Sequence, residues 1–104
     1  MDQQEFIQLA DACLEHFADA LEEFDPDEVD FSCTDGVLTI EFADGARYVL
    51  NRQTAASQMW FAAGARAWHY VWDGSAWKCD RDGHDLTACV SSSISEKIGR
   101  EVSL

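Results

Sequence analysis

Apolar residues recur every three or four positions over residues 3–24, and this spacing predicts one amphipathic helix. An α-helix turns by about 100° per residue, so most acidic positions of the segment fall opposite the apolar stripe. Asp25-Pro26 predicts the end of the helix, because Pro cannot continue a helix and Asp favours a turn. The stripe consists of Phe6, Ala10, Cys13, Phe17, Leu21 and Phe24.

After this helix the pattern changes to alternation of apolar and polar positions, which predicts half-buried antiparallel strands. In the segment 37–43, Leu38, Ile40 and Phe42 provide the apolar positions. Asp-Gly dipeptides at 35–36, 44–45 and 73–74 predict tight turns between strands. Six strands are expected, over residues 29–34, 37–43, 46–53, 57–63, 65–72 and 76–79.

A second helix is predicted over residues 85–98, where Leu86, Val90, Ile94 and Ile98 are spaced four apart and Gly99 follows as a stop signal. A helix, an antiparallel meander and a helix predict an α+β fold, a two-layer sandwich in a single domain over residues 1–104. Both helices are expected to cover one face of the sheet of about six strands. The other face is expected to meet water.

The composition is that of a folded but strongly acidic chain. Hydrophobic residues make up 47% and the net charge is −13. Fourteen Asp and Glu precede Arg47, the first basic residue. This balance argues against nucleic acid and anionic membranes as partners, because both bind Lys and Arg. It favours metal cations, basic proteins or simple solubility.

The four cysteines, Cys13, Cys33, Cys79 and Cys89, form no CxxC pair. Reduced thiols that belong mostly to the core are expected, although an even count leaves disulfides open. The acidic N-terminus is unlike a targeting segment, and no apolar run is long enough to span a bilayer. We therefore expect a soluble, cytoplasmic protein.

The acidic residues of the first helix suit hard cations, since carboxylates four apart on a helix can share one hydrated ion. Asp11, Glu15, Asp19 and Glu23 have this spacing. The set continues around the turn into the first strand with Glu22, Asp25, Asp27, Glu28 and Asp30. The alternative is a solvated face that keeps the protein soluble.

Two features of this segment favour a functional use over solubility alone. No Lys or Arg is interleaved, although each ion pair four residues apart would stabilise the helix by about 0.2–0.5 kcal/mol. Glu22 and Glu23 also lie at the predicted C-terminal end, where the helix dipole disfavours anions. The negative field itself is therefore predicted to have a role.

Such a convex site would offer few ligands per ion, so binding should be weak, exchangeable and tolerant of different cations. His16 could add a nitrogen ligand one turn from Asp19, or be a surface histidine without a role. Cys79 and His84 are five apart with no partner pair, too little for a zinc site.

On the open face of the sheet, alternation places Trp60 among Asn51, Gln53 and Gln58. An exposed Trp ringed by amides is typical of a protein-binding anchor, because Trp is enriched at interface hot spots. The alternative is a Trp that lies flat on its neighbours without a partner. Nucleotide-binding, P-loop, serine-hydrolase and zinc-protease motifs are absent, so no enzyme signature is found.

Four segments together resemble the frataxin family, specifically its short bacterial branch, the CyaY proteins. They are EFIQLAD at 5–11, DGVLTIEFADG at 35–45, NRQTAASQMW at 51–60 and CDRDG at 79–83. The segment at 51–60 is the most specific, and the resemblance runs nearly end to end. Ala55 stands where relatives often carry Pro, and the Ser-rich second helix is less apolar than usual.

The resemblance implies an iron-binding protein that regulates iron–sulfur cluster assembly by docking on the cysteine desulfurase and its scaffold protein. It implies weak, exchangeable Fe²⁺ or Fe³⁺, replaceable by other divalent cations, and a monomer in the absence of metal. By position, the ridge ligands would be Glu15, Asp19, Glu22, Glu23, Asp25, Asp27, Glu28 and Asp30, with Asp11 added from spacing alone. The partner surface would be Asn51, Arg52, Gln53, Gln58 and Trp60.

Two other functions remain open from the sequence. One is a ferroxidase that stores oxidised iron in metal-driven oligomers, which needs a rigid oxidation centre that no motif marks. The other is an acidic module that occupies basic proteins and binds metal only incidentally.

Overall fold

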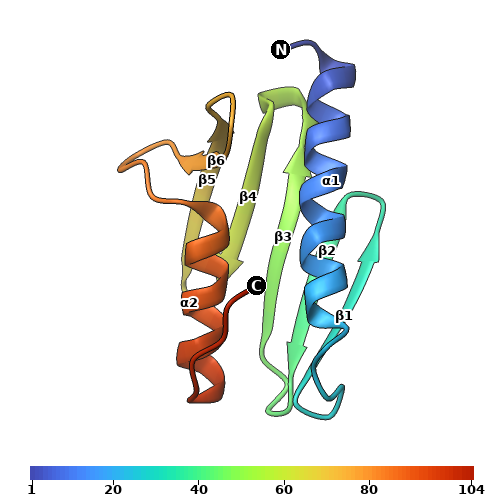
Figure 1. Cartoon of the computed structure of the whole chain (residues 1–104), viewed down its shortest axis with the longest axis vertical. Helices are drawn as coiled ribbons and strands as arrows, with labels where there is room; N and C mark the ends of the chain where they lie inside the picture. Colours follow the sequence, from blue (N-terminus) through green and yellow to red (C-terminus); the bar gives the residue numbers. More distant parts are fainter.

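Two helices lie on one face of a six-stranded sheet in the computed structural model, which describes all residues from 1 to 104 (Figure 1). The strands follow one another in sequence order, each antiparallel to the next. The elements are α1 (Gln3–Leu21), β1 (Val29–Thr34), β2 (Val37–Phe42), β3 (Arg47–Gln53), the single turn η1 (Thr54–Ala56), β4 (Gln58–Ala63), β5 (Arg66–Trp72), β6 (Trp77–Cys79) and α2 (Leu86–Ile98). The predicted α+β sandwich is confirmed.

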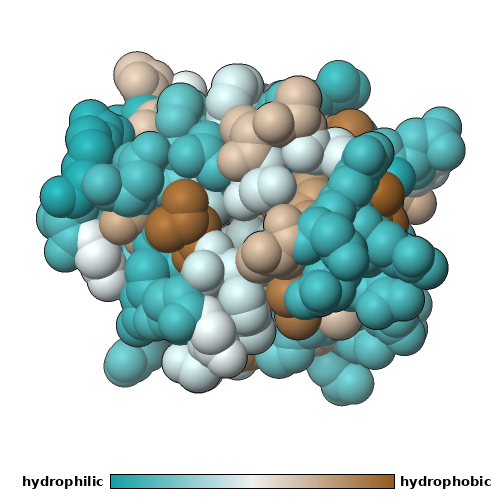
Figure 2. Space-filling model, turned by 90° about the horizontal axis from the view of Figure 1, so that it is seen from above, coloured by the Kyte–Doolittle hydropathy of each residue, from teal (hydrophilic) through white to brown (hydrophobic).

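The core forms where the apolar stripes of the helices meet the alternate apolar residues of the strands. From α1 the buried residues are Phe6, Ala10, Leu14, Phe17 and Leu21. From the strands the most deeply buried include Leu38, Ile40, Leu50, Met59 and Phe61. Viewed from above, the surface is mostly hydrophilic with small separated hydrophobic areas, so the large apolar side chains lie inside (Figure 2).

The first helix ends at Leu21, three residues earlier than predicted. The N–H of Phe24 bonds the carbonyl of Leu21, three residues back, so the chain tightens into a turn. Pro26 disfavours helical backbone at Asp25, so the helix does not resume after this turn. The side chain of Asp25 accepts a bond from the N–H of Asp27 (2.9 Å) and fixes this turn.

The predicted turn at Asp35-Gly36 and the predicted helix stop at Gly99 are both present. Asp35 and Gly36 have φ of 53° and 78°, the two positive values that a two-residue turn between twisted strands requires. Gly99 ends α2 in the left-handed conformation, with φ of 76°. The strand limits agree with the predicted ones to within one residue.

The serines of α2 have a structural role that its sequence pattern did not indicate. Ser95 Oγ accepts a bond from the N–H of Val102 (2.8 Å), and Ser91 Oγ accepts one from Leu104 (3.1 Å). These bonds hold the C-terminal residues back along the helix, between α2 and α1 (Figure 1). The low apolar content of this helix therefore serves to anchor the tail.

All four cysteines are free thiols. Burial raises the pKa of Cys13 to about 12, so that side chain stays protonated at neutral pH.

Neither helix combines the length and the apolar content that crossing a bilayer requires.

Candidate functional site

An acidic ridge follows the outer side of α1, the turn after it and the start of β1, which lie next to each other at one edge of the molecule (Figure 1). We define the acidic ridge as the nine predicted metal-binding residues. All are exposed except Glu28, which is half-buried. They are Asp11, Glu15, Asp19, Glu22, Glu23, Asp25, Asp27, Glu28 and Asp30.

Basic side chains contact the acidic ridge only at two residues. Arg52 of β3 pairs with Asp11, and Arg100 after α2 pairs with Glu28. The hydrogen bond from Arg100 lowers the pKa of Glu28 below its usual range. The other seven carboxylates have no Lys or Arg within 4.0 Å. The centre of the ridge therefore carries uncompensated negative charge.

The remaining basic residues are used elsewhere in the fold. Four of the seven Lys and Arg pair with carboxylates outside the acidic ridge: Arg47 with Glu41, Arg66 with Glu96, Lys78 with Asp85 and Lys97 with Asp44. Arg81 bonds the carbonyl oxygen of Ala67 (3.1 Å). The acidic ridge thus holds nine of the twenty Asp and Glu but receives only two of the seven Lys and Arg.

The C-terminal ends of the two helices also differ in whether a basic residue is present. Lys97 lies in the last turn of α2, where the helix dipole favours a cation. The last turn of α1 has no basic residue, and Glu22 is its C-cap. The unfavourable placement of acid at the end of α1 is therefore a property of this surface and not of both helices.

The carboxylates of the acidic ridge are spread out and do not converge on one point. No three ligand atoms of this surface lie within 4.8 Å of one another. Asp25 and Asp30 each use one oxygen to accept a bond from a nearby main-chain N–H, at 2.9 Å in both cases. An ion here would meet few protein ligands and keep much of its water, as predicted for an open site.

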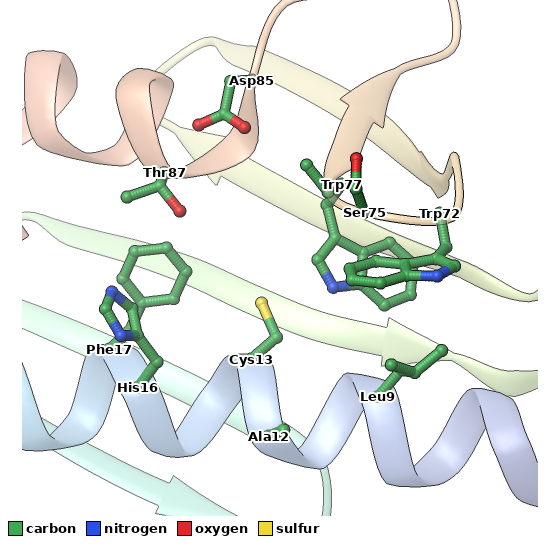
Figure 3. A pocket seen from close by; sticks show the side chains of 11 residues that line it. Leu9, Ala12, Cys13, His16, Phe17, Trp72, Ser75, Trp77, Asp85 and Thr87 are labelled. Carbon is green, nitrogen blue, oxygen red and sulfur yellow. The ribbon is translucent and has the colours of Figure 1, made fainter.

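The side chain of His16, the residue after Glu15, points into a pocket on the side of α1 that faces β6 and α2. It lines a pocket of about 410 Å³ between α1 and the segment from β5 to α2, where its ring packs edge-on against Phe17 (centroids 5.3 Å apart) (Figure 3). The pocket is lined by Leu9, Ala12, Cys13, His16, Phe17, Trp72, Ser75, Ala76, Trp77, Asp85 and Thr87. In this arrangement His16 belongs to no group of three ligand atoms within 4.8 Å of one another.

Trp60 stands on the open face of the sheet, opposite the helices. Its register partner on β3 is Asn51, and its Nε1 donates to Oε1 of Gln58 (2.9 Å). The indole stacks on His69 of β5, with centroids 4.3 Å apart and planes 16° from parallel. Trp60 thus lies flat on a neighbour and is still only half-buried. His69 was missed, although it is the register partner of Trp60 on β5.

Arg52 does not share this face with the other four predicted partner residues. Its register partner, Met59, is fully buried, and its guanidinium reaches Asp11 on α1. Alternation along β3 requires this, because Arg52 lies one residue from both Asn51 and Gln53. The open-face set is therefore Asn51, Gln53, Gln58 and Trp60, and Arg52 belongs with the helices.

A frataxin-like domain model matches residues 1–100. The chain is 39% identical to the iron–sulfur cluster assembly protein CyaY of Dechloromonas aromatica (strain RCB), over 100% of this chain and 99% of that one. Its fold is similar to that of frataxin from Psychromonas ingrahamii, with a TM-score of 0.90, 30% identity, and 99% and 97% of the two chains covered.

A second solved structure is more distant. It is a trimeric frataxin from the yeast Saccharomyces cerevisiae, complexed with ferrous iron, with a TM-score of 0.77 and 29% identity. The match covers 88% of this chain and 86% of that one. From the domain match over residues 1–100 and the full-length identity to a CyaY protein, the chain belongs to the frataxin family.

Proposed function

We propose that this protein regulates iron–sulfur cluster assembly without being an enzyme, by presenting weakly bound iron and a negative surface to the cysteine desulfurase and its scaffold protein. The observation that carries the proposal is the group of seven carboxylates of the acidic ridge that have no Lys or Arg partner. A relative 39% identical over the full chain is named for cluster assembly, and a yeast relative was solved with ferrous iron.

Iron suits the acidic ridge because hard cations prefer carboxylate oxygens. Since no three ligand atoms converge there, an ion would exchange readily with solvent. Weak binding is consistent with handing iron on, whereas a storage site would need a closed set of ligands. Other divalent cations of similar hardness should compete for the same carboxylates.

The partner would meet two adjoining surfaces. Asp30 at the end of the ridge lies one residue from Val29 and Phe31, which pack inward, so its side chain points to the open face. A row of register partners crosses that face from Thr34 through Val37 and Asn51 to Trp60. A basic partner could therefore contact the carboxylates at the edge of the sheet and Trp60 near its middle.

The direct test compares two double variants of equal charge change for binding to the purified desulfurase. Glu22→Lys with Glu23→Lys reverses the unpaired centre of the ridge. Glu96→Lys with Glu101→Lys makes the same change at exposed positions at and beyond the end of α2. We expect the ridge variant to lose affinity at least tenfold and the control to bind like the unchanged protein. Equal losses, or none, would contradict a docking role for the ridge.

Trp60→Ala extends the same assay to the open face. Because Trp60 is only half-buried, its truncation should leave the fold intact while weakening desulfurase binding. Ala62 on the same strand is exposed on the same face, so Ala62→Ser is a matched mild control. Unchanged affinity of the Trp60 variant would remove the open face from the proposed interface.

The non-enzymatic part of the proposal has a separate test. Stopped-flow oxygen consumption after addition of Fe²⁺ should not exceed that of the buffer alone. Consumption that rises with protein concentration, together with growth of oligomers, would favour the ferroxidase and storage function instead.

A further inference from the structure

A second group of ligand-type side chains lies far along the chain from the acidic ridge, at the end of β6 and in the turn between β6 and α2. One ligand atom each from Cys79, Asp82 and His84 lie within 4.8 Å of one another. The spacing of Cys79 and His84 alone suggested no site, because two ligands are too few. The fold adds Asp82 as the third.

The backbone of this turn is closed by its own hydrogen bonds. The N–H of Gly83 bonds the carbonyl of Cys79 (3.0 Å), and the N–H of Cys79 bonds the carbonyl of His84 (2.8 Å). Asp82 Oδ1 accepts a third bond, from the N–H of His84 (3.0 Å). Gly83 has φ of 77°, which favours glycine and allows the tight reversal. The three side chains are therefore held together before any ligand binds.

The ring of His84 is held at both nitrogens. Its Nδ1 lies 2.6 Å from Asp82 Oδ1, and its Nε2 lies 2.7 Å from the hydroxyl of Tyr70. Tyr70 is fully buried, so its hydroxyl is held in place beside this nitrogen. Metal-bound histidines usually direct their other ring nitrogen to a fixed hydrogen-bond partner. Tyr70 would provide that partner.

The three side chains differ in how far they are exposed to solvent, and one end of the group is accessible to an ion. Cys79 is 5% exposed, His84 is half-buried and Asp82 is exposed. The thiol thus lies at the closed end, and the carboxylate lies toward solvent. An ion could enter past Asp82, and water could occupy a fourth position.

We propose that Cys79, Asp82 and His84 form a binding site for a divalent cation of the zinc class, separate from the acidic ridge. Sγ of Cys79, a carboxylate oxygen of Asp82 and Nδ1 of His84 would bind the ion. The thiol releases its proton to solvent on binding. The Nδ1 proton moves to Nε2 by exchange with solvent, so that Nε2–H donates to the Tyr70 oxygen and one proton is released in total. The thiolate and the carboxylate then balance the ion's two charges.

The site at Cys79, Asp82 and His84 and the acidic ridge should prefer different metal ions. A thiolate and an imidazole prefer zinc-like ions, whereas the ridge offers only oxygen ligands. In a tetrahedral zinc site the ligand atoms lie roughly 3.3–3.8 Å apart, as follows from bond lengths of about 2.0–2.3 Å. Nδ1 of His84 and Oδ1 of Asp82, now 2.6 Å apart, must therefore separate by about 1 Å, while no ligand atom lies more than 4.8 Å from another. This site goes beyond the proposed function and does not depend on it.

The test is an anaerobic titration of the reduced full-length protein with Co²⁺, which reports thiolate ligation by a sulfur-to-metal charge-transfer absorption. We expect this absorption to saturate at one equivalent and to be displaced by Zn²⁺. His84→Gln and Asp82→Asn should each weaken binding at least tenfold, since even partners of ligands contribute about 10–100-fold. Cys79→Ser should abolish the absorption.

Matched controls separate this site from other thiols and acids. Cys33→Ser removes an exposed thiol on β1, and Asp80→Asn removes a carboxylate of the same turn that is outside the group. Neither variant should change the absorption. The ridge variant, Glu22→Lys with Glu23→Lys, should not change it either. Amide spectra would verify that each variant is folded. The proposal would be overturned by the absence of a charge-transfer absorption, by an absorption that titrates with the same affinity in His84→Gln, or by amide shifts on Co²⁺ addition that are confined to residues 11–30.

Discussion

The guanidinium of Arg52 on β3 donates a hydrogen bond to the carboxylate of Asp11 on α1. This pair links the first helix to the middle of the sheet, between positions 41 residues apart in sequence. It also neutralises one end of the acidic ridge. A residue predicted to face a partner protein thus holds two layers of the fold together.

Arg52→Gln should lower the free energy of unfolding by about 0.2–1 kcal/mol, the usual value for a partly exposed ion pair. Asp11→Asn should have a similar effect, and the double variant should cost little more than either single one. Urea unfolding of the four proteins measures this coupling directly. Fully additive losses would mean that the two side chains act independently.

Gly36→Ala tests how closely Arg52 packs. A Cβ at Gly36 would lie 2.7 Å from Nε of Arg52, and the φ of 78° adds backbone strain of about 1–2 kcal/mol. Gly45→Ala is the matched control, because its φ is 87° and nothing lies within 4 Å of the added atom.

We therefore expect Gly36→Ala to destabilise the fold more than Gly45→Ala does, by an amount similar to the loss of the Arg52–Asp11 pair. In an Arg52→Ala background the two glycine variants should become equal in urea unfolding. A difference that persists there would assign the cost to the turn itself and not to Arg52.

Reversing the charges at the end of α1 should make the isolated protein more stable. Glu22 and Glu23 are exposed, unpaired and at the negative end of the helix dipole. Lys at each position should contribute about 0.3–1 kcal/mol. For a domain of this size, a gain of about 1 kcal/mol raises Tm by roughly 4–8 °C. A lower Tm for the double variant would contradict the claim that the acidic residues of the ridge reduce the stability of the fold.

The carboxylate of Asp44 should make the stability of the fold fall at acid pH. Lys97, and then the N–H of Ala46, hold the pKa of Asp44 below its usual value. A carboxyl whose pKa is lower in the folded state stabilises the fold above its unfolded pKa, roughly pH 4 for Asp. That contribution is lost as the pH falls through the lower, folded-state pKa.

Asp44→Asn should therefore be less stable than the unchanged protein at pH 7, and the difference should shrink below about pH 4. Urea unfolding across this range measures it. Glu101→Gln is the control, because Glu101 has no basic partner and should show no such convergence. A constant difference at all pH values would mean that the Asp44 carboxylate acts through something other than its charge.

The fold followed from the sequence because its signals are local and agree with one another. The stripe of α1, the alternation in β2 and the turn at Asp35-Gly36 each specify one element, and neighbouring strands pair in order. The end of α1 was predicted too late, since Phe24 continues the apolar spacing although it lies in a turn. Periodicity cannot distinguish a last helical turn from the tighter turn that follows.

The acidic ridge was predicted because its residues are close in sequence. Arg52 was included in the partner surface by its place in a motif, although alternation along β3 points it at the helices. Two features depended on tertiary contacts instead. His69 stacks on Trp60 only because β4 and β5 pair, and Tyr70 reaches His84 only through the β5–β6 hairpin. No short-range pattern contains such contacts.

The central claim is that the acidic ridge binds exchangeable iron. An anaerobic Fe²⁺ titration of the ¹⁵N-labelled protein tests it most directly, because bound paramagnetic iron broadens nearby amide signals. We predict broadening confined to residues from about Asp11 to Asp30, strongest near the unpaired carboxylates, and reduced by Glu22→Lys with Glu23→Lys. Amides in this range that stay sharp at several equivalents of iron would contradict the claim and leave the carboxylates only as a field for a basic partner.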